Sequence, residues 1–312
     1  MGIAGKTLGL PWEILRSVRG SPFSAGDGHG VRHVIALGLR VRLLQSNRVP
    51  EGHTIHRLAL DHTRLLAGRV ISVSSPQGRH PQLSAVLDGH VLQNVEAFGK
   101  HLFYHWRDAP ILHIHLGLIG SFRESASSAG PSVQLRLASS SGAVDLVGAT
   151  TCELIDAPRR QEILDRLGPD LLANDADPER AWERLSKREI PIASALLDQR
   201  ILSGVGNVYR AEALFINGIH PLRPANTLTR AEFQNLWATL ATMLRQGVED
   251  RRIVTVHASE RAAVGVETVA PEDAFYVYKQ QHCRRCGTPI SMVTLGPRRA
   301  YACEHCQPPP RY

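Results

Sequence analysis

Four cysteines near the C-terminus have the number and spacing of a metal site. They form two Cys-x-x-Cys pairs that enclose 16 residues, and each pair can turn two thiolates toward one tetrahedral ion. Because four thiolates leave no open coordination position, the spacing predicts one structural Zn²⁺ rather than a catalytic metal. His282 and His305 lie beside the pairs, and we expect them to be surface residues. The predicted ligands are Cys283, Cys286, Cys303 and Cys306.

A second candidate for chemistry is the pair Pro50 and Glu51, which has the character of a mature N-terminus although it lies inside the chain. Within a chain, the proline nitrogen is a tertiary amide whose lone pair is delocalised into the carbonyl group. At a true N-terminus the same nitrogen is a free secondary amine and a good nucleophile. Pro50 can therefore do chemistry only in a form of the protein that begins with it.

Residues 1–49 have the character of an extension outside the folded protein. They show no sustained apolar period, and the stretch 20–30 is rich in glycine, serine and proline. The apolar run at 34–39 is too short to span a bilayer, and no small-residue cleavage site follows it, so we expect neither membrane insertion nor export. Cysteines suited to metal ligation rather than disulfides indicate the cytoplasm.

Charge is unevenly distributed along the chain. The formal net charge is +7, but residues 1–49 hold seven Lys or Arg against two Asp or Glu, which leaves +2 for the rest. Residues 279–312 hold six basic residues and one acid, which is typical of a module that binds phosphate. Between the cysteine pairs, Arg298 and Arg299 are placed to clamp a DNA phosphate. A solvated charge is the alternative for either arginine.

Apolar periodicity predicts an α+β fold with three parts after Pro50. Residues 54–67 have helical spacing and end before Gly68. From 159 to 250 the period is again helical, with a glycine-rich turn at 203–207. Between these helical parts, short apolar or alternating runs predict a sandwich of antiparallel strands. The predicted strands are 70–73, 91–95, 101–106, 111–116, 133–137 and 143–147, and the predicted domains are 50–158 (sandwich), 159–274 (helical) and 275–312 (zinc module).

Four motifs occur together and in register along the chain. They are Pro50-Glu51-Gly52, the Phe-Gly-Lys-His-Leu segment at 98–102, the segment 198–214 around the glycine-rich turn, and the four-cysteine ribbon. In type, order and spacing they resemble the formamidopyrimidine-DNA glycosylase and endonuclease VIII family over residues 50–306. The branch that the sequence resembles most is the endonuclease VIII-like proteins of actinobacteria, through residues 50–54, 74–79 and 113–118.

The resemblance implies a catalytic β-sandwich domain with a flanking helix, a helix-two-turn-helix domain and a zinc finger, with damaged double-stranded DNA as the partner. It also implies a bifunctional DNA glycosylase and abasic-site lyase. A free Pro50 amine would attack C1′ of a flipped nucleoside, expel the base and form an iminium that permits β,δ-elimination. The pKa of such an amine is about two units below that of a lysine side chain. We therefore expect translation to start at Val49, with the initiator residue removed afterwards.

The resemblance also implies roles for three further polar residues. Glu51 would move protons at the sugar ring and during elimination, and the alternative is a helix cap. Lys100 is one of only four lysines in a chain with 32 arginines, and it matches the catalytic lysine that contacts phosphate and assists proton transfer. Asn207 would bind a backbone phosphate together with exposed main-chain N–H groups, and a helix N-cap is its alternative.

Two more positions follow from the same resemblance. Arg298 matches the finger arginine by its distance before Cys303, with Arg299 as its substitute. Leu118, with Ile119 beside it, matches the wedge region that fills the space left by an extruded base, and a core strand is the alternative. We expect Glu212 to orient neighbouring groups rather than to react.

Two other functions stay open from the sequence. One is a non-catalytic DNA-binding protein in which Pro50 remains in an amide bond. The other is the same enzyme acting on oxidised purines such as 8-oxoguanine, whereas the branch resemblance favours oxidised pyrimidines. We expect a monomer associated with the nucleoid in the cytoplasm, and no membrane partner.

Overall fold

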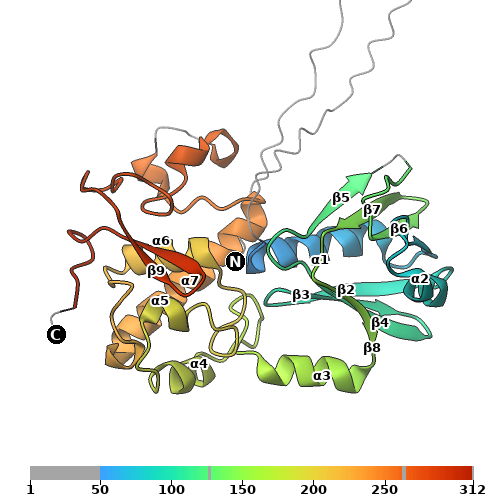
Figure 1. The fold of residues 1–312 in the computed structure, drawn as a ribbon, viewed down its shortest axis with the longest axis horizontal. Helices are drawn as coiled ribbons and strands as arrows, with labels where there is room; N and C mark the ends of the chain where they lie inside the picture. The colour runs from blue at the N-terminus through green and yellow to red at the C-terminus, as the bar shows by residue number, and fades with distance from the viewer. Residues whose placement is uncertain (1–49, 126–127, 262–264, 311–312) are drawn as a thin grey trace, which may run out of the picture. The chain divides into compact units, whose positions relative to one another are not determined.

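The computed structural model describes residues 50–125, 128–261 and 265–310. Helices and antiparallel sheets together build the fold, with most of the helices after the strands of the two large sheets (Figure 1). This confirms the predicted α+β class. The predictions for residues 1–49, including translation from Val49, lie outside the described residues. Among the described helices, none is long and apolar enough to cross a membrane.

The N-terminal part is a sandwich of two four-stranded antiparallel sheets. One sheet has the strand order β1-β6-β7-β5 and the other the order β2-β3-β4-β8. Because successive side chains point to opposite faces of a strand, each sheet can contribute one apolar face to a shared core. The strands are β1 (Ser72–Ser74), β2 (Leu92–Phe98), β3 (His101–Trp106), β4 (Ala109–His115), β5 (Ser121–Ser125), β6 (Leu135–Ser139), β7 (Gly142–Val147) and β8 (Thr151–Ile155).

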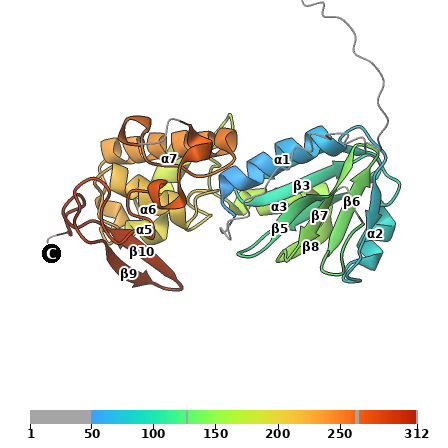
Figure 2. The same cartoon turned by 90° about the horizontal axis from the view of Figure 1, so that it is seen from above.

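Helix α1 (Gly52–Leu66) packs against this sandwich and confirms the helix predicted at 54–67. Its buried residues Ile55, Ala59 and Leu66 belong to the same core cluster as Leu102 of β3. This i, i+4, i+11 spacing places them on one face of the helix. Figure 2 shows α1 lying along the sheet that contains β3. The packing fixes the start of α1, where Pro50 and Glu51 stand.

Six of the eight strands were predicted, and two strands and one helix were missed. Strand β5 contains no buried residue, so it carries none of the apolar alternation on which the prediction depends. Strand β8 is an edge strand paired with β4 alone, and only its last residue is buried. Helix α2 (Pro81–Leu87) is too short to establish a helical period.

The helical part forms a second core around α6 (Asn207–Ile216) and α7 (Arg230–Asp250). Helix α6 is the more deeply placed, since all its residues from Val208 to Phe215 are buried. Helix α7 begins with a capping box in which Thr229 and Glu232 satisfy each other's backbone N–H groups. The remaining helices are α3 (Ala157–Arg166), α4 (Pro178–Leu185) and α5 (Ile192–Ala195), with 3₁₀ turns η1 (Ala225–Thr227), η2 (Ala258–Glu260), η3 (Val266–Thr268) and η4 (Pro271–Asp273).

The C-terminal module is an antiparallel hairpin of β9 (Ser291–Leu295) and β10 (Arg298–Ala302) between the two cysteine pairs. Its core contains Tyr301 and Cys303 together with Phe215 of α6. Glu212 of α6, which is fully buried, accepts hydrogen bonds from the backbone N–H groups of residues 276–278 and from the Thr255 hydroxyl. Glu212 therefore connects α6 to the segment that leads into the hairpin.

Candidate active site

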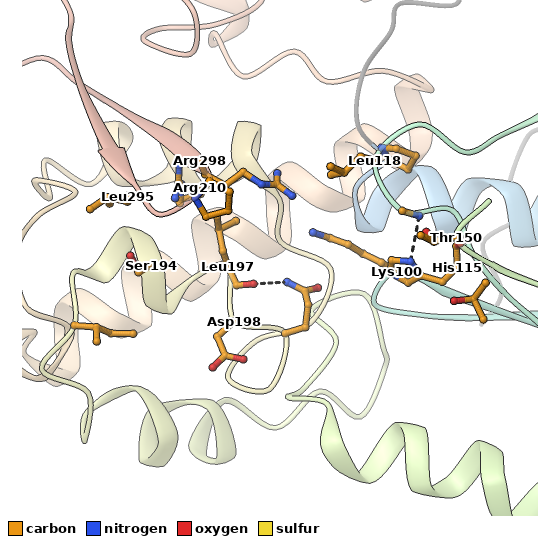
Figure 3. A pocket seen from close by; sticks show the side chains of 16 residues that line it. Lys100, His115, Leu118, Thr150, Ser194, Leu197, Asp198, Arg210, Leu295 and Arg298 are labelled. Carbon is orange, nitrogen blue, oxygen red and sulfur yellow. Dashed lines mark hydrogen bonds between the residues drawn. The ribbon is translucent and has the colours of Figure 1, made fainter. Parts of the chain in front are cut away.

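One cavity of about 810 Å³ brings together residues from the sandwich, the helical part and the hairpin. Of the predicted site residues, it is lined by Pro50, Lys100, Leu118 and Arg298. Figure 3 shows Lys100 and Leu118 on one side of this cavity and Arg298 on the other. The other lining residues are His115, Gly117, Thr150, Thr151, Ile190, Ser194, Leu197, Asp198, Gln199, Arg210, Leu295 and Pro297.

Glu51 follows Pro50 in the chain and is only 1 % exposed. Its Oε1 accepts a hydrogen bond from the Val208 N–H at 2.9 Å, and its Oε2 accepts one from the Tyr209 N–H at 3.4 Å. Burial raises the pKa of the Glu51 carboxyl, while Lys100 and the backbone N–H groups act in the opposite direction. A buried carboxyl with a raised pKa can exchange protons nearer to neutral pH than an exposed one.

The alternative role of Glu51, a side-chain cap of its own helix, is wrong. Glu51 occupies the N-cap position of α1, but its side chain makes no capping hydrogen bond there. Instead it caps the N-terminus of α6, where unpaired N–H groups favour a negative charge. Gly206 makes this approach feasible, because a Cβ at that position would lie 2.2 Å from Glu51 Cδ.

Lys100 reaches from the turn between β2 and β3 into the cavity. Its Nζ donates a hydrogen bond to the Val205 carbonyl at 2.7 Å, just before the start of α6. Burial lowers the pKa of the Lys100 ammonium; Glu51 acts in the opposite direction and Arg298 adds to the decrease. The charges of an acid and of a second cation thus act on the lysine in opposite directions.

The turn that carries Lys100 is held by Asp170, a residue that the sequence analysis did not single out. Asp170 is 1 % exposed, and its Oδ2 accepts hydrogen bonds from the Gly99 N–H and from His56 Nε2, both at 2.7 Å. Gly99 has φ of +57°, and a Cβ there would lie 2.9 Å from Ser203 Cβ. A glycine is therefore required for the turn to approach the glycine-rich segment.

Asn207 is the first residue of α6 and stands at the other end of the same glycine-rich turn. Its Oδ1 accepts a hydrogen bond from Arg210 Nη2. The expectation that phosphate would also meet exposed N–H groups here is wrong for Val208 and Tyr209, because Glu51 occupies both. Asn207 is not the side-chain N-cap either, since Gly206 holds that position.

Of the two hairpin arginines, Arg298 is the one that lines the cavity. Arg299 is the next residue of β10, and adjacent side chains point to opposite faces of a strand. The Arg299 side chain is exposed, while its carbonyl oxygen accepts a hydrogen bond from Arg210 Nη2 at 2.7 Å. The geometry therefore favours Arg298 over Arg299 as the arginine directed at a ligand in the cavity.

Sequence comparison assigns both large parts of this chain to known domains. Residues 49–150 match the model of the formamidopyrimidine-DNA glycosylase N-terminal domain, and residues 167–258 match that of the formamidopyrimidine-DNA glycosylase H2TH domain. The chain belongs to the formamidopyrimidine-DNA glycosylase and endonuclease VIII family. It is accordingly an enzyme of the DNA glycosylase and abasic-site lyase class, as the sequence motifs predicted.

Individual relatives support the predicted branch of this family. Endonuclease 8 1 of Mycobacterium tuberculosis is 40 % identical over 270 residues, which cover 83 % of this chain and all of that protein. The probable endonuclease 8 2 of Streptomyces coelicolor is 33 % identical, over 84 % of this chain and 96 % of that protein. The formamidopyrimidine-DNA glycosylase of Lactococcus lactis, solved with abasic-site DNA, shares the fold at a TM-score of 0.70 and 22 % identity, over 83 % of this chain and all of that one.

The turn after β4 presents the wedge residues predicted from the family. Leu118 is 56 % exposed and Ile119 is 83 % exposed, so the alternative that they form a core strand is wrong. Large apolar side chains with this much exposure contribute little buried apolar surface to the stability of the free protein. Leu118 lines the cavity, which fits a contact with a ligand.

The four cysteines of this glycosylase-family chain converge as their spacing predicted. Their Sγ atoms all lie within 4.8 Å of one another, and three of the Sγ pairs are separated by 3.9, 3.4 and 3.5 Å. A tetrahedral Zn²⁺ with Zn–S bonds of ~2.3 Å would place its sulfurs ~3.8 Å apart. The cluster therefore fits a metal ion of this kind. It consists of Cys283, Cys286, Cys303 and Cys306.

Sequence reasoning did not assign roles to His115 and Arg210, which both line the cavity. His115 Nδ1 accepts a hydrogen bond from the Gly117 N–H at 3.1 Å, which leaves Nε2 as the protonated nitrogen of the neutral ring. Burial lowers the pKa of His115, and Lys100 and His113 add to the decrease. His115 was part of a motif used for the resemblance, so the motif was a usable signal. Nothing in the sequence alone distinguishes Arg210 from 31 other arginines.

Proposed function

We propose that the protein is a bifunctional glycosylase and abasic-site lyase that acts on damaged double-stranded DNA through the free amine of Pro50. One observation carries the proposal: Pro50 lines a cavity with Lys100 and Arg298, and the carboxyl of the next residue, Glu51, is buried. This arrangement supplies a nucleophile, a proton carrier and cations for phosphate in one place. As a genome-repair enzyme it would act at the nucleoid, as a monomer.

The proposed reaction begins with attack of the Pro50 nitrogen on C1′ of an extruded nucleoside. The N–C1′ bond forms as the bond from C1′ to the base breaks, and the base leaves with a proton from the site. Ring opening gives an iminium between Pro50 and C1′. Loss of a proton from C2′ then expels the 3′ phosphate, and loss of a proton from C4′ expels the 5′ phosphate. Water releases the sugar fragment and restores the amine.

Glu51 and Lys100 are the proposed proton carriers for these steps. The carboxyl of Glu51 has its pKa raised by burial, so it can both donate and accept protons near the working pH. The pKa of the Lys100 ammonium is lowered by burial, which increases the fraction available as a base. In its protonated form, Lys100 would also stabilise the negative charge of the phosphate that leaves.

Asn207 and Arg298 are proposed to hold the DNA backbone beside the cavity. The guanidinium group of Arg298 can form a charge-assisted, bidentate contact with a phosphate. Asn207 can donate to a phosphate oxygen through its amide nitrogen. Leu118 is proposed as the wedge that replaces the extruded base in the stack.

We favour oxidised pyrimidines as the lesion class, because the sequence resembles the endonuclease VIII branch. Oxidised purines are the second candidate, supported by the match to formamidopyrimidine-DNA glycosylase domain models. A non-catalytic DNA-binding protein is the third, and it holds if Pro50 is never released from its amide bond.

The active form is proposed to begin at Pro50, through translation from Val49 and removal of the initiator residue. The family domain model begins at residue 49, and the relative from Mycobacterium tuberculosis is matched over its whole length by 83 % of this chain. N-terminal sequencing of the protein from its native cells tests this directly. Detection of residues 1–48 in the active protein would contradict it.

The metal in the cysteine cluster is proposed to be one Zn²⁺ held by Cys283, Cys286, Cys303 and Cys306. Four thiolates close its coordination sphere, so it would stabilise the hairpin and take no part in the reaction. The hairpin in turn would hold Arg298 at the cavity.

Borohydride trapping on duplex DNA with an abasic site or thymine glycol tests the proposed function. We compare the chain that begins at Pro50 with a matched chain that carries Gly-Ser in front of Pro50, which blocks only the amine. A covalent adduct with the first chain and none with the second is the expected result. Equal trapping by both would contradict a role for the Pro50 amine, and DNA binding without any adduct would support the non-catalytic alternative.

A further inference from the structure

Arg210 is a buried cation that makes no ion pair within the described part of the chain, although the charge of Glu51 favours its protonated form. It is 1 % exposed, and the acceptors of its hydrogen bonds are uncharged oxygens. Nη1 donates to the Ala193 carbonyl at 3.1 Å, and Nη2 donates to the Arg299 carbonyl at 2.7 Å and to Asn207 Oδ1. Its Nε is buried and has no acceptor among the described residues. A buried charge in such surroundings is costly, so fold stability alone does not explain it.

The three acceptors of Arg210 belong to three separate segments. Ala193 lies in α5, Asn207 is the first residue of α6, and Arg299 lies in β10. A guanidinium group presents five N–H donors in a rigid plane and can serve all three at once, whereas a lysine ammonium cannot span them. Arg210 therefore joins the hairpin that carries Arg298 to the start of α6.

The contact with Arg210 also determines how the Asn207 amide is turned. A guanidinium group can only donate hydrogen bonds, so Asn207 must direct its Oδ1 toward Arg210. The two N–H donors on Nδ2 then make no hydrogen bond within the described part of the chain. A phosphate oxygen can only accept hydrogen bonds, so this orientation is the one in which Asn207 can bind phosphate.

Arg210 adds to the positive charge of the cavity that it lines with Lys100 and Arg298. Burial, and after it the charge of Arg298, lowers the pKa of Arg210 to about 10, while Glu51 acts in the opposite direction. Arg210 is therefore charged at neutral pH. Three cations thus face one cavity. The summed positive charge would favour the approach of an anion to the cavity.

We propose that Arg210 is a positioning residue for phosphate binding. It orients the Asn207 amide so that its N–H donors point away from Arg210, and it fixes the hairpin that carries Arg298. Asn207 and Arg298 can then bind the same DNA phosphate. The inference rests on the proposed function and goes beyond it, because Arg210 acts through two other residues and not on the DNA itself.

The test compares Arg210→Lys, which keeps the charge but loses the three-way contact, with Arg166→Lys on the exposed surface of α3. Both are made in the chain that begins at Pro50. For Arg210→Lys we expect about tenfold weaker binding of abasic-site duplex. The single-turnover rate of borohydride trapping at saturating DNA should change by less than about threefold, because Pro50 and Glu51 are untouched. The Arg166→Lys control should change neither quantity.

Two results would overturn the inference. Binding by Arg210→Lys as tight as wild type would show that charge alone suffices. In the double variant Arg210→Lys/Asn207→Ala, the factors by which the two single substitutions weaken DNA binding could also multiply. That result would show that the two residues act independently. No trapping by the unmodified chain that begins at Pro50 would instead count against the proposed function, so the two failures are distinguishable.

A second pair of variants keeps the test open if Arg210→Lys does not fold. Asn207→Asp supplies Arg210 with a counter-ion, whereas Asn207→Ala removes its acceptor. We expect Asn207→Asp to melt at a higher temperature than Asn207→Ala, while both lose DNA affinity. Equal melting temperatures would contradict the contact on which the inference depends.

Discussion

Glu51 Oε1 accepts a hydrogen bond from the Val208 N–H at 2.9 Å, between residues 157 positions apart in the chain. Through this contact a carboxyl beside the proposed nucleophile caps α6, the helix that also begins with the proposed phosphate ligand Asn207. The same bond joins the sandwich to the helical part. Displacement of Glu51 should therefore affect chemistry and domain contact together.

Substitution of Glu51 by Gln should separate these two effects. Glutamine keeps one oxygen that can accept from Val208, so α6 remains capped, but it cannot carry a proton. General acid–base catalysis typically contributes ~10²–10⁴-fold to a rate, and we expect a loss of base excision in that range with little change in melting temperature. The measurement is single-turnover excision on duplex DNA. Wild-type rates in Glu51→Gln would remove Glu51 from the mechanism.

Substitution of Gly206 by Ala should disturb Glu51 without altering any charged group. The added Cβ would lie 2.2 Å from Glu51 Cδ, so the carboxyl must move away from α6. We expect an excision rate at least ~10²-fold lower, comparable to the loss of the acid itself. Gly130→Ala is the matched control, because nothing lies within 4 Å of a Cβ at that glycine. Equal activity of both variants would refute the steric argument.

Substitution of Leu118 by Ala should impair action on duplex DNA more than on single strands. Base extrusion costs a few kcal/mol of lost stacking per step, which the wedge is proposed to offset, whereas a single strand has little stacking to lose. We expect a loss of ~10–100-fold on duplex substrate. Val86→Ala is the control, because Val86 is another exposed apolar side chain, 43 % exposed, and does not line the cavity. A uniform loss on both substrates would argue against a wedge.

The sequence predicted the parts of the molecule that depend on local patterns. Helix α1, six strands and the convergence of the cysteine pairs follow from apolar period and from ligand spacing. It did not predict that Glu51 caps α6, because that contact joins segments far apart in sequence and depends on a close approach at Gly206. Asp170 was missed for the same reason: its partners His56 and Gly99 lie in other elements.

Hairpin geometry supplied another result that the sequence could not. Arg298 and Arg299 are equivalent by composition and spacing, and only the alternation of β10 places one at the cavity and leaves the other exposed. The family motif did indicate Arg298 by its distance before Cys303. Physical reasoning from the residues alone left both open, because strand register depends on pairing with β9.

Removal of the proposed zinc ion should weaken DNA binding before it unfolds the sandwich. The core of the C-terminal module contains Cys283 and Cys303 themselves, so loss of the ion should release the hairpin and with it Arg298. Cys286→Ser should weaken DNA binding by about tenfold or more, as expected for loss of a charge-assisted phosphate contact. Cys152→Ser, outside the cluster, is the control. Metal content and DNA affinity are measured on the same preparations, and unchanged affinity in a metal-free protein would contradict this role.

Acid should destabilise the sandwich through His62. This histidine is 1 % exposed, and its Nδ1 lies 2.6 Å from the Tyr104 hydroxyl. Burial lowers the pKa of His62 to about 4 from the ordinary 6.5, with Asp61 acting in the opposite direction. The folded state therefore binds its proton less readily than the unfolded state, so stability is complete above pH 6.5 and is lost as the pH falls toward 4.

The size of this effect follows from the difference between the pKa of His62 in the unfolded state, 6.5, and in the folded state, about 4. Stability should decrease by roughly 3 kcal/mol between pH 7 and pH 4 on account of His62. His101, whose pKa is lowered to about 3 mainly by burial, contributes in the same direction. Urea unfolding at several pH values measures the slope in wild type and in His62→Gln. The His62→Gln variant should retain the pH dependence of stability that is due to His101. Its free energy of unfolding should change less steeply with pH than that of wild type, because the unfolded state then has one fewer histidine to protonate. Identical slopes would mean that His62 is already protonated, or free to become so, in the folded sandwich.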